Sequence, residues 1–183
     1  MTRGLVHNYT GDGKGKTTAA LGLVLRACGR GLRCCVVQFM KGRSDSGEAI
    51  AISRFLAPAQ AEIAQFGRAP KPGEQYAWVD PQNILPADRE AAEQGLAFAA
   101  QALNSGKFDL VVLDEVNLAV AWGILDEERV EALLHSRPES VEVVLTGCQA
   151  TPGLLRLADL ITEMKDVKHP FADGVSGRPG VEF

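Results

Sequence analysis

A glycine- and lysine-rich segment near the N-terminus carries the residue types that bind phosphate. Residues 10–18 have the sequence TGDGKGKTT and separate a short apolar run from a segment with helical periodicity. Glycines allow successive backbone N–H groups to turn toward phosphate oxygens, and a helix N-terminus adds partial positive charge. In such a segment Lys16 reaches the outer phosphates and the Thr17 hydroxyl ligates Mg²⁺. The pattern predicts a P-loop that binds a nucleoside triphosphate.

The segment departs from the pattern G-x-x-x-x-G-K-[ST] at one position, where Thr10 replaces the first glycine. The Gly-Lys-Thr end and the strand–loop–helix context are both present, so the prediction stands. Lys16 and Thr17 are the predicted catalytic residues, and Lys14 either assists them or is an exposed loop lysine. The predicted ATP-binding residues in the loop are Gly11, Asp12, Gly13, Lys14, Gly15, Lys16, Thr17 and Thr18.

Two acidic residues follow the most hydrophobic predicted strand. Asp114 and Glu115 come directly after residues 108–113, an arrangement that resembles a Walker B segment. The carboxyl ends of neighbouring parallel strands meet at one crevice, and carboxylates there hold Mg²⁺ directly or through water. We therefore predict Thr17, Asp114 and Glu115 as metal-binding residues. The alternative for Asp114 is a helix cap.

Strands and helices alternate along the chain, which is typical of an α/β protein with a mostly parallel sheet. With the P-loop, this pattern predicts a sheet flanked by helices in a P-loop NTPase (RecA-like) fold, as a single domain over residues 1–183. Residues 67–86 are rich in proline and predict a long loop. The predicted strands cover residues 5–9, 33–39, 63–66, 108–113, 141–146 and 160–164, and the predicted helices cover residues 15–28, 48–56, 86–103, 126–135 and 151–158.

The bulk composition is that of a soluble globular protein, with 46% hydrophobic and 23% charged residues. A formal net charge of −4 argues against a nucleic-acid partner. No apolar run is long enough to cross a membrane and the N-terminus lacks a signal-peptide pattern, so we expect a cytoplasmic protein with no membrane partner. The four cysteines form no C-x-x-C pair, and we expect reduced thiols, with Cys34 and Cys35 on opposite faces of a strand.

Five segments resemble the P-loop type of corrinoid adenosyltransferase, a family of cobalamin biosynthesis and salvage. The resemblance runs from about residue 4 to residue 183, and its most diagnostic part is the segment near the C-terminus. The matching segments are YTGDGKGKTTAALG (residues 9–22), VVQFMKG (36–42), VVLDEVN (111–117), VVLTG (143–147) and ADLITEMKDVKHPF (158–171).

This resemblance implies that cobalt(I) of a corrinoid attacks C5′ of ATP and expels tripolyphosphate. ATP and the corrinoid are then substrates and Mg²⁺ is the cofactor. The implied partners are an electron-donating flavoprotein or other reductase and a second copy of the chain, with which it forms a homodimer. Arg26 matches a family arginine that we assign to phosphate contact, with a solvated helix arginine as the alternative. The implied corrinoid contacts are Trp78, Lys168, His169 and Phe171.

Some positions depart from the family pattern. Residues 146–152 (TGCQATP) lack an arginine expected there, and residues 67–88 fit poorly. His7 and His135 are not expected to ligate cobalt, because the family is expected to remove the axial ligand before reduction. Tyr76 and Trp122 are further candidates for the apolar corrin face, with simple packing as the alternative.

Two other functions remain open from the residues alone. One is a P-loop ATPase or small kinase, in which Asp114 binds Mg²⁺ and Glu115 polarises a water molecule. The other is a nucleotide-binding module without turnover. The segment at residues 158–171 favours the adenosyltransferase over both, and the sequence leaves open whether the acceptor is cobyrinic acid a,c-diamide, cobinamide or cobalamin.

Overall fold

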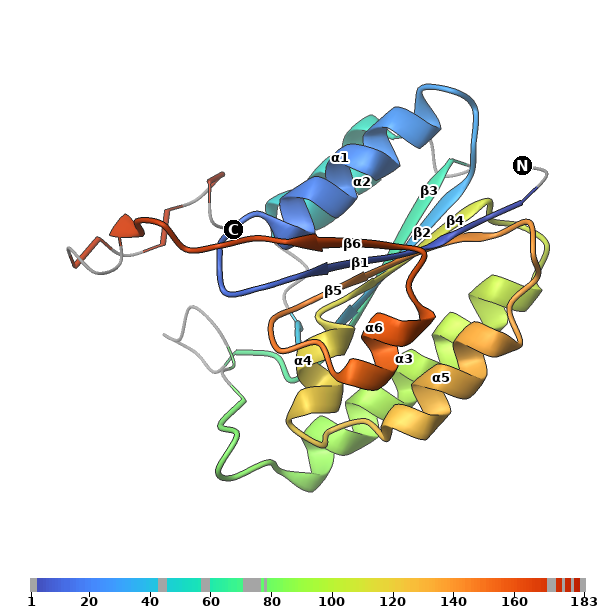
Figure 1. Ribbon diagram of the computed structural model, residues 1–183. Coiled ribbons are helices and arrows are strands. Elements are labelled where there is room, and N and C mark those ends of the chain that lie inside the picture. The colour runs from blue at the N-terminus through green and yellow to red at the C-terminus, as the bar shows by residue number, and fades with distance from the viewer. Residues whose placement is uncertain are drawn as a thin grey trace.

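A parallel sheet forms the centre of the protein (Figure 1), which is described here from a computed structural model. The structure describes residues 3–42, 46–56, 60–70, 77, 79–170, 174–175, 177–178 and 180–181. Within these residues the sheet has six strands in the order β3-β2-β4-β5-β1-β6, and every pairing is parallel. The strands are β1 (Val6–Thr10), β2 (Cys34–Phe39), β3 (Ala61–Phe66), β4 (Leu110–Asp114), β5 (Glu142–Thr146) and β6 (Leu160–Glu163).

Helices cover both faces of this sheet, which confirms the predicted α/β class (Figure 1). Helices α1 (Lys16–Cys28) and α2 (Gly47–Phe55) lie on one face. The other face carries α3 (Pro86–Asn104), α4 (Val116–Ala121), α5 (Glu127–His135) and α6 (Pro152–Leu157). Helix α4 was not predicted, because six residues after a strand are too few to show helical periodicity.

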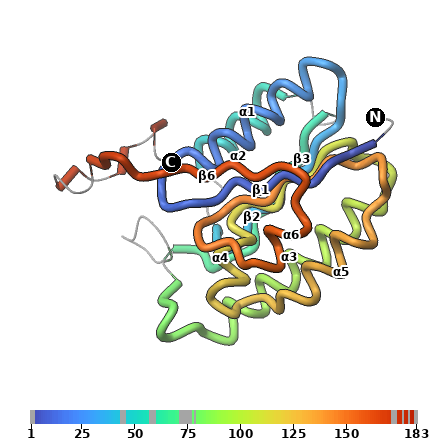
Figure 2. The backbone as a smooth tube through the Cα atoms, in the orientation of Figure 1, coloured from blue at the N-terminus to red at the C-terminus, as the bar shows by residue number. Residues whose placement is uncertain are grey.

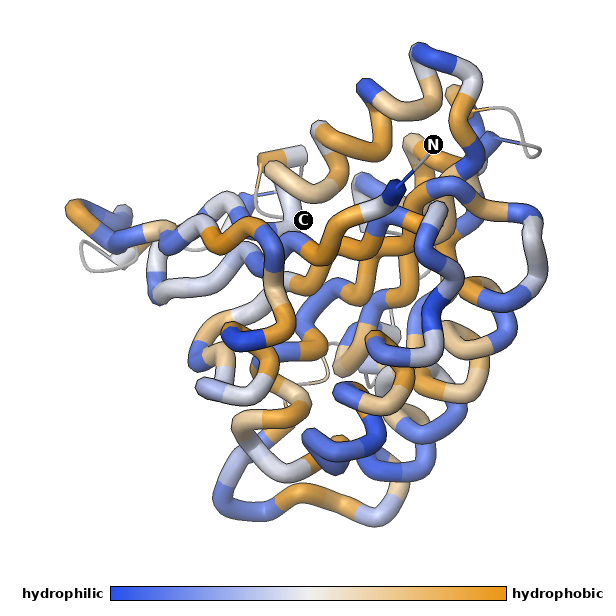
Figure 3. The backbone as a smooth tube through the Cα atoms, turned by 45° about the vertical axis from the view of Figure 1, so that its right-hand side comes forward, coloured by the Kyte–Doolittle hydropathy of each residue, from blue (hydrophilic) through white to orange (hydrophobic). Residues whose placement is uncertain are grey.

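Strand β2 shows why the sheet is buried on both sides. Its residues are all buried, and its side chains alternate between two separate cores. Cys34 and Val36 pack toward α1 and α2, whereas Cys35 and Val37 pack toward α3 and α4. The predicted opposite orientation of the two cysteines is therefore confirmed. Figure 3 shows apolar residues along the strands in the interior and polar segments along the outer helices.

The strand order places the end of β1 and the end of β4 near the same edge of the sheet. Strand β5 lies between them, and the connection from β1 through α1 crosses over to β2. The connection from β1 to β2 runs along the sheet in one direction, and the connection from β4 to β5 runs in the other. Ligands of open parallel sheets bind in the crevice where the direction of the connections reverses. The fold therefore brings residues 10–18 and Asp114 to one crevice.

The C-terminal segment returns across the P-loop after β6 (Figure 2). The Met164 N–H donates to the Thr10 carbonyl, and the Gly13 N–H donates to the Met164 carbonyl, both at 2.8 Å. Further along, Lys14 Nζ donates to the Val181 carbonyl at 3.2 Å. This segment is thus part of the wall around the loop. In the part of the chain that is described, no helix is long and apolar enough to cross a membrane.

Candidate functional site: a nucleotide cavity

The P-loop adopts a conformation that depends on its glycines. Gly15 has φ 115° and forms the N-cap of α1, a conformation that side-chain-bearing residues rarely adopt. Gly13 has no room for a side chain, because an added Cβ would lie 2.7 Å from the Lys165 carbonyl carbon. Lys16 is 7% exposed, and its ammonium donates to the carbonyls of Gly11 and Gly13 at 2.7 Å each. The lysine is therefore held inside the loop that it serves.

Thr10 has a structural role where the pattern calls for glycine. Its hydroxyl oxygen accepts a hydrogen bond from the Ala150 N–H at 3.3 Å. This contact ties the start of the P-loop to the loop after β5, which contributes Cys148 to the same cavity. The departure from the pattern therefore leaves the loop geometry intact.

Asp114 is the centre of the polar network beneath the loop. Its side chain is fully buried, and each carboxylate oxygen accepts two hydrogen bonds. Oδ1 accepts from the hydroxyls of Thr17 at 2.7 Å and Thr146 at 2.6 Å. Oδ2 accepts from Gln38 Nε2 at 2.9 Å and Lys41 Nζ at 2.7 Å. The carboxylate thus orients the Thr17 hydroxyl from behind.

The charges around Asp114 favour its ionised form. Burial raises the pKa of the Asp114 carboxyl, but the Lys41 ammonium and the Thr146 and Thr17 hydroxyls outweigh burial and lower that pKa. Burial likewise lowers the pKa of the Lys41 ammonium, and the facing carboxylates, led by Asp114, more than offset it. Both groups are therefore charged at neutral pH.

Glu115 is placed differently from its neighbour. It has φ 64°, and its N–H donates to Thr146 Oγ1 at 3.0 Å. This left-handed turn ends β4 and starts α4, so Glu115 rather than Asp114 is the N-cap, although its side chain makes no capping hydrogen bond. Burial, followed by the charge of Asp114, raises the pKa of the Glu115 carboxyl. The alternative role of Asp114 as a helix cap is therefore wrong. The Glu115 side chain faces the cavity.

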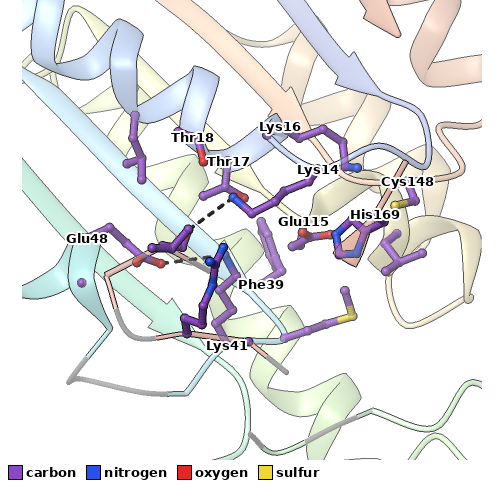
Figure 4. Close-up of a pocket in the computed structure, with 18 of the residues that line it drawn as sticks. Lys14, Lys16, Thr17, Thr18, Phe39, Lys41, Glu48, Glu115, Cys148 and His169 are labelled. Atoms are coloured by element: carbon purple, nitrogen blue, oxygen red, sulfur yellow. Dashed lines mark hydrogen bonds and ion pairs between the residues drawn. The ribbon is translucent and has the colours of Figure 1, made fainter. Parts of the chain in front are cut away.

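A cavity of about 840 Å³ opens above these residues. Figure 4 shows Lys14, Lys16 and Thr17 along one wall, Lys41 beside Glu48, and Glu115 near His169. Apolar side chains and residues of the C-terminal segment also line the cavity. These lining residues include Phe39, Val79, Leu118, Trp122, Pro170, Val175 and Val181.

Comparison with known proteins decides which class of P-loop protein this is. Residues 2–183 match the family described as ATP:corrinoid adenosyltransferase BtuR/CobO/CobP. The chain belongs to this family. It is 39% identical to the corrinoid adenosyltransferase of Pseudomonas aeruginosa, over 99% of this chain and 84% of that protein. It is 35% identical to the corrinoid adenosyltransferases of Escherichia coli K12 and Salmonella typhimurium, over 99% of this chain and 86% of each.

Most of the predicted nucleotide residues of this adenosyltransferase-family chain meet at the cavity. The structure brings Lys14, Gly15, Lys16, Thr17 and Thr18 to its wall. Gly11 and Gly13 support the loop through the carbonyls that accept from Lys16, and Asp12 is exposed outside the cavity. Arg26 is exposed near the end of α1, about 15 Å along the helix from Lys16 at 1.5 Å per residue. Its contact with phosphate stays a prediction.

The predicted corrinoid residues are only partly placed. His169 lines the cavity, whereas Lys168 is exposed and does not. Trp122 also lines the cavity, in agreement with its candidacy for an apolar face. Trp78, Tyr76 and Phe171 lie outside the described residues. Ala77 and Val79 both line the cavity, so the long loop contributes to this site.

Sequence reasoning missed several residues that hold the adenosyltransferase site together. Lys41, Gln38 and Thr146 all donate to Asp114, and Asn117 near the start of α4 donates to Asn8 Oδ1 and to the Gly147 carbonyl. Each lies within a segment that carries the family resemblance, but a polar residue inside a buried strand gives no indication of its partner. The sequence did carry one signal, because Gln38 and Thr146 interrupt otherwise apolar strands. A polar side chain buried in such a strand must find a hydrogen-bond partner there.

The donor set at the cavity fits Mg²⁺. Thr17 and Glu115 offer a hydroxyl and a carboxylate oxygen to the cavity, and Asp114 orients the hydroxyl. Across the described residues there is no cluster of three or more His, Cys, Asp or Glu side chains arranged as a metal cage. Mg²⁺ is commonly held by one or two protein oxygens together with substrate phosphates. The residues therefore suit a metal that arrives with a nucleotide.

Proposed function

We propose that this protein transfers the 5′-deoxyadenosyl group of ATP to the cobalt(I) of a corrinoid and releases tripolyphosphate. The family match over residues 2–183 carries the proposal. The cavity supports it, because its volume of about 840 Å³ is lined both by P-loop residues and by apolar side chains. That volume lies in the upper part of the range for small-molecule sites, about 300–1,000 Å³.

The reaction is an alkyl transfer, and its demands differ from those of a kinase. Cobalt(I) supplies an electron pair to C5′, a cobalt–carbon bond forms, and the C5′–O bond breaks with its electron pair on the triphosphate oxygen. No proton is transferred, so no general base is needed. The main requirement is stabilisation of charge on the leaving triphosphate, which preorganised donors provide.

The residues of the P-loop wall match this requirement. Lys16 exchanges its two carbonyl acceptors for phosphate oxygens, and the N–H groups at the start of α1 face the same charge. Thr17 and Glu115 would hold Mg²⁺, with Asp114 behind Thr17, and the bound metal would supply further positive charge to the phosphates. Lys14 reaches the cavity from the exposed side of the loop.

The apolar side chains of the lining suit the flat face of a corrin. Leu118, Trp122 and Val79 line the cavity, and His169 of the C-terminal segment lines it as well. The natural acceptor is a corrinoid intermediate or cobalamin itself. The proposal also includes a cytoplasmic location, a single domain and a homodimeric state. Its electron donor is a flavoprotein or other reductase.

An anaerobic assay with ATP, Mg²⁺ and chemically reduced cob(I)alamin tests the proposal. We expect the cobalt(I) absorption band to decay as a photolabile alkylcobalt product and tripolyphosphate form. Lys16→Ala should lower kcat about 10²- to 10³-fold, the loss expected for one well-placed electrostatic donor. Lys107→Ala is the control, because Lys107 is exposed and remote from the cavity residues. An unchanged cobalt(I) band with release of orthophosphate would refute the transferase and support an ATPase.

A further inference from the structure

Lys41 enters the site by an unusual route. Strand β2 ends at Phe39, and Met40 then adopts a left-handed conformation with φ 57°. This turn sends the Lys41 side chain back under the cavity, where Nζ lies 2.7 Å from Asp114 Oδ2. The Lys41 side chain is 31% exposed and that of Asp114 is 0% exposed. The ion pair therefore has one buried end and one end at the cavity.

Lys41 also faces the carboxylate of Glu48 on α2. Its Nζ is 3.9 Å from Glu48 Oε1, and Gln38 Nε2 donates to that same oxygen at 3.0 Å. Gln38 Nε2 donates to Asp114 Oδ2 as well, so one amide bridges the two carboxylates. Lys41 and Gln38 thus link α2 to the acidic end of β4.

The acceptor capacity of Asp114 is fully used without a metal. A carboxylate offers about four lone-pair positions. Two hydroxyls, one amide and the Lys41 ammonium occupy them. A metal that ligated Asp114 directly would have to displace one of these donors. Glu115 differs, because its side chain faces the cavity and accepts no described side-chain hydrogen bond.

We propose that Lys41 is a positioning residue of the nucleotide site. Its ammonium, rather than the metal, neutralises Asp114. Asp114 then holds the Thr17 hydroxyl, and contact with the metal falls to Thr17 and Glu115. The inference rests on the proposed nucleotide function. The principal role of Lys41 in this proposal involves no contact with phosphate. Its effect on the metal is transmitted through Asp114.

The test uses Mn²⁺ as the probe and measures binding as well as turnover. ATP affinity is measured with Mn²⁺ and with EDTA, and bound Mn²⁺ is followed by electron paramagnetic resonance. Lys41→Met should reduce the enhancement of ATP binding by Mn²⁺ about 10- to 100-fold, as the loss of an outer-shell partner does. ATP affinity in EDTA should change less than about threefold. Lys41→Arg should retain most of the enhancement, and Lys107→Met should leave it unchanged.

A double-mutant cycle with Asp114→Asn separates a positioning role from a direct one. If Lys41 acts through Asp114, Lys41→Met should add less than about threefold in the Asp114→Asn background. Removing both charges together also avoids an unpaired buried carboxylate, so the double variant remains informative where Lys41→Met alone does not fold. Thermal unfolding of each variant identifies that case.

Three results would overturn the inference. These are an unchanged or larger Mn²⁺ enhancement in Lys41→Met, an equal loss of ATP affinity with Mn²⁺ and with EDTA, and multiplicative losses in the double variant. The second and third would make Lys41 a direct phosphate ligand. Failure of the unmodified protein to bind ATP at all would instead refute the proposed function.

Discussion

A reciprocal amide pair, Asn8 and Asn117, joins β1 to α4 behind the nucleotide site. Both side chains are fully buried. Asn117 Nδ2 donates to Asn8 Oδ1 at 2.8 Å and to the Gly147 carbonyl at 3.1 Å, and Asn8 Nδ2 donates to Asn117 Oδ1 at 3.2 Å. The pair therefore fixes the relative positions of three strand ends, those that lead to the P-loop, to Glu115 and to Cys148. Replacing Asn117 with leucine should destabilise both the fold and the site.

The magnitude follows from the groups that lose their partners. Asn117→Leu leaves both polar groups of the Asn8 amide and the Gly147 carbonyl unpaired, and at about 1–3 kcal/mol for each of these three groups the loss should be at least about 3 kcal/mol. Asn8→Leu leaves Asn117 Oδ1 unpaired and should cost about 1–2 kcal/mol. The double variant leaves only the Gly147 carbonyl unpaired, so the two losses should be non-additive by at least about 2 kcal/mol.

Urea unfolding of the single and double variants measures this coupling. Asn104→Leu is the matched control, because Asn104 is exposed and, among the described residues, its side chain bonds to a carbonyl of its own helix alone. It should change the unfolding free energy by less than about 0.5 kcal/mol. ATP affinity should fall in Asn117→Leu, since the start of α4 loses its hydrogen bonds to Asn8 and Gly147. Additive losses within about 0.5 kcal/mol would refute the account of the amide pair.

Other predictions concern the glycines and the cysteines. Gly22→Ala should stabilise the protein by about 0.5–1 kcal/mol in thermal unfolding, because an added Cβ meets nothing within 4 Å in α1. Gly13→Ala should destabilise it by about 1–3 kcal/mol and weaken ATP binding, because the added Cβ would collide with backbone of the C-terminal segment; stability equal to that of the unmodified protein would contradict this close approach. Burial raises the pKa of the Cys35 thiol to about 12 and raises that of Cys34 further still, so both remain neutral and unreactive toward iodoacetamide at about pH 8. Half-buried Cys148 should be alkylated first, and MgATP should slow its modification, as mass spectrometry would show; faster labelling of the buried thiols would count against the packing of β2.

The sequence by itself determined the elements that have a strong local signal. The P-loop was predictable because its glycines and Lys16 serve a backbone conformation that few other residues allow. Strands such as β2 and β4 were predictable because a strand buried on both faces is a nearly continuous apolar run. The α/β class followed from their alternation with amphipathic helices. The family resemblance in residues 158–171 directed the functional prediction toward corrinoid chemistry.

Only the tertiary structure decided how Asp114 and Glu115 differ. They are adjacent in sequence, yet the left-handed turn at Glu115 directs one carboxylate into the polar network and the other toward the cavity. The partners of Asp114 come from β2, α1, β5 and the turn after Phe39, which are distant along the chain and meet only when the sheet assembles. A hydrogen bond between distant segments depends on strand order and register, and these are properties of the whole sheet that no local pattern specifies. For the same reason the position of Lys41 and the lining of the cavity by the C-terminal segment belong to the fold.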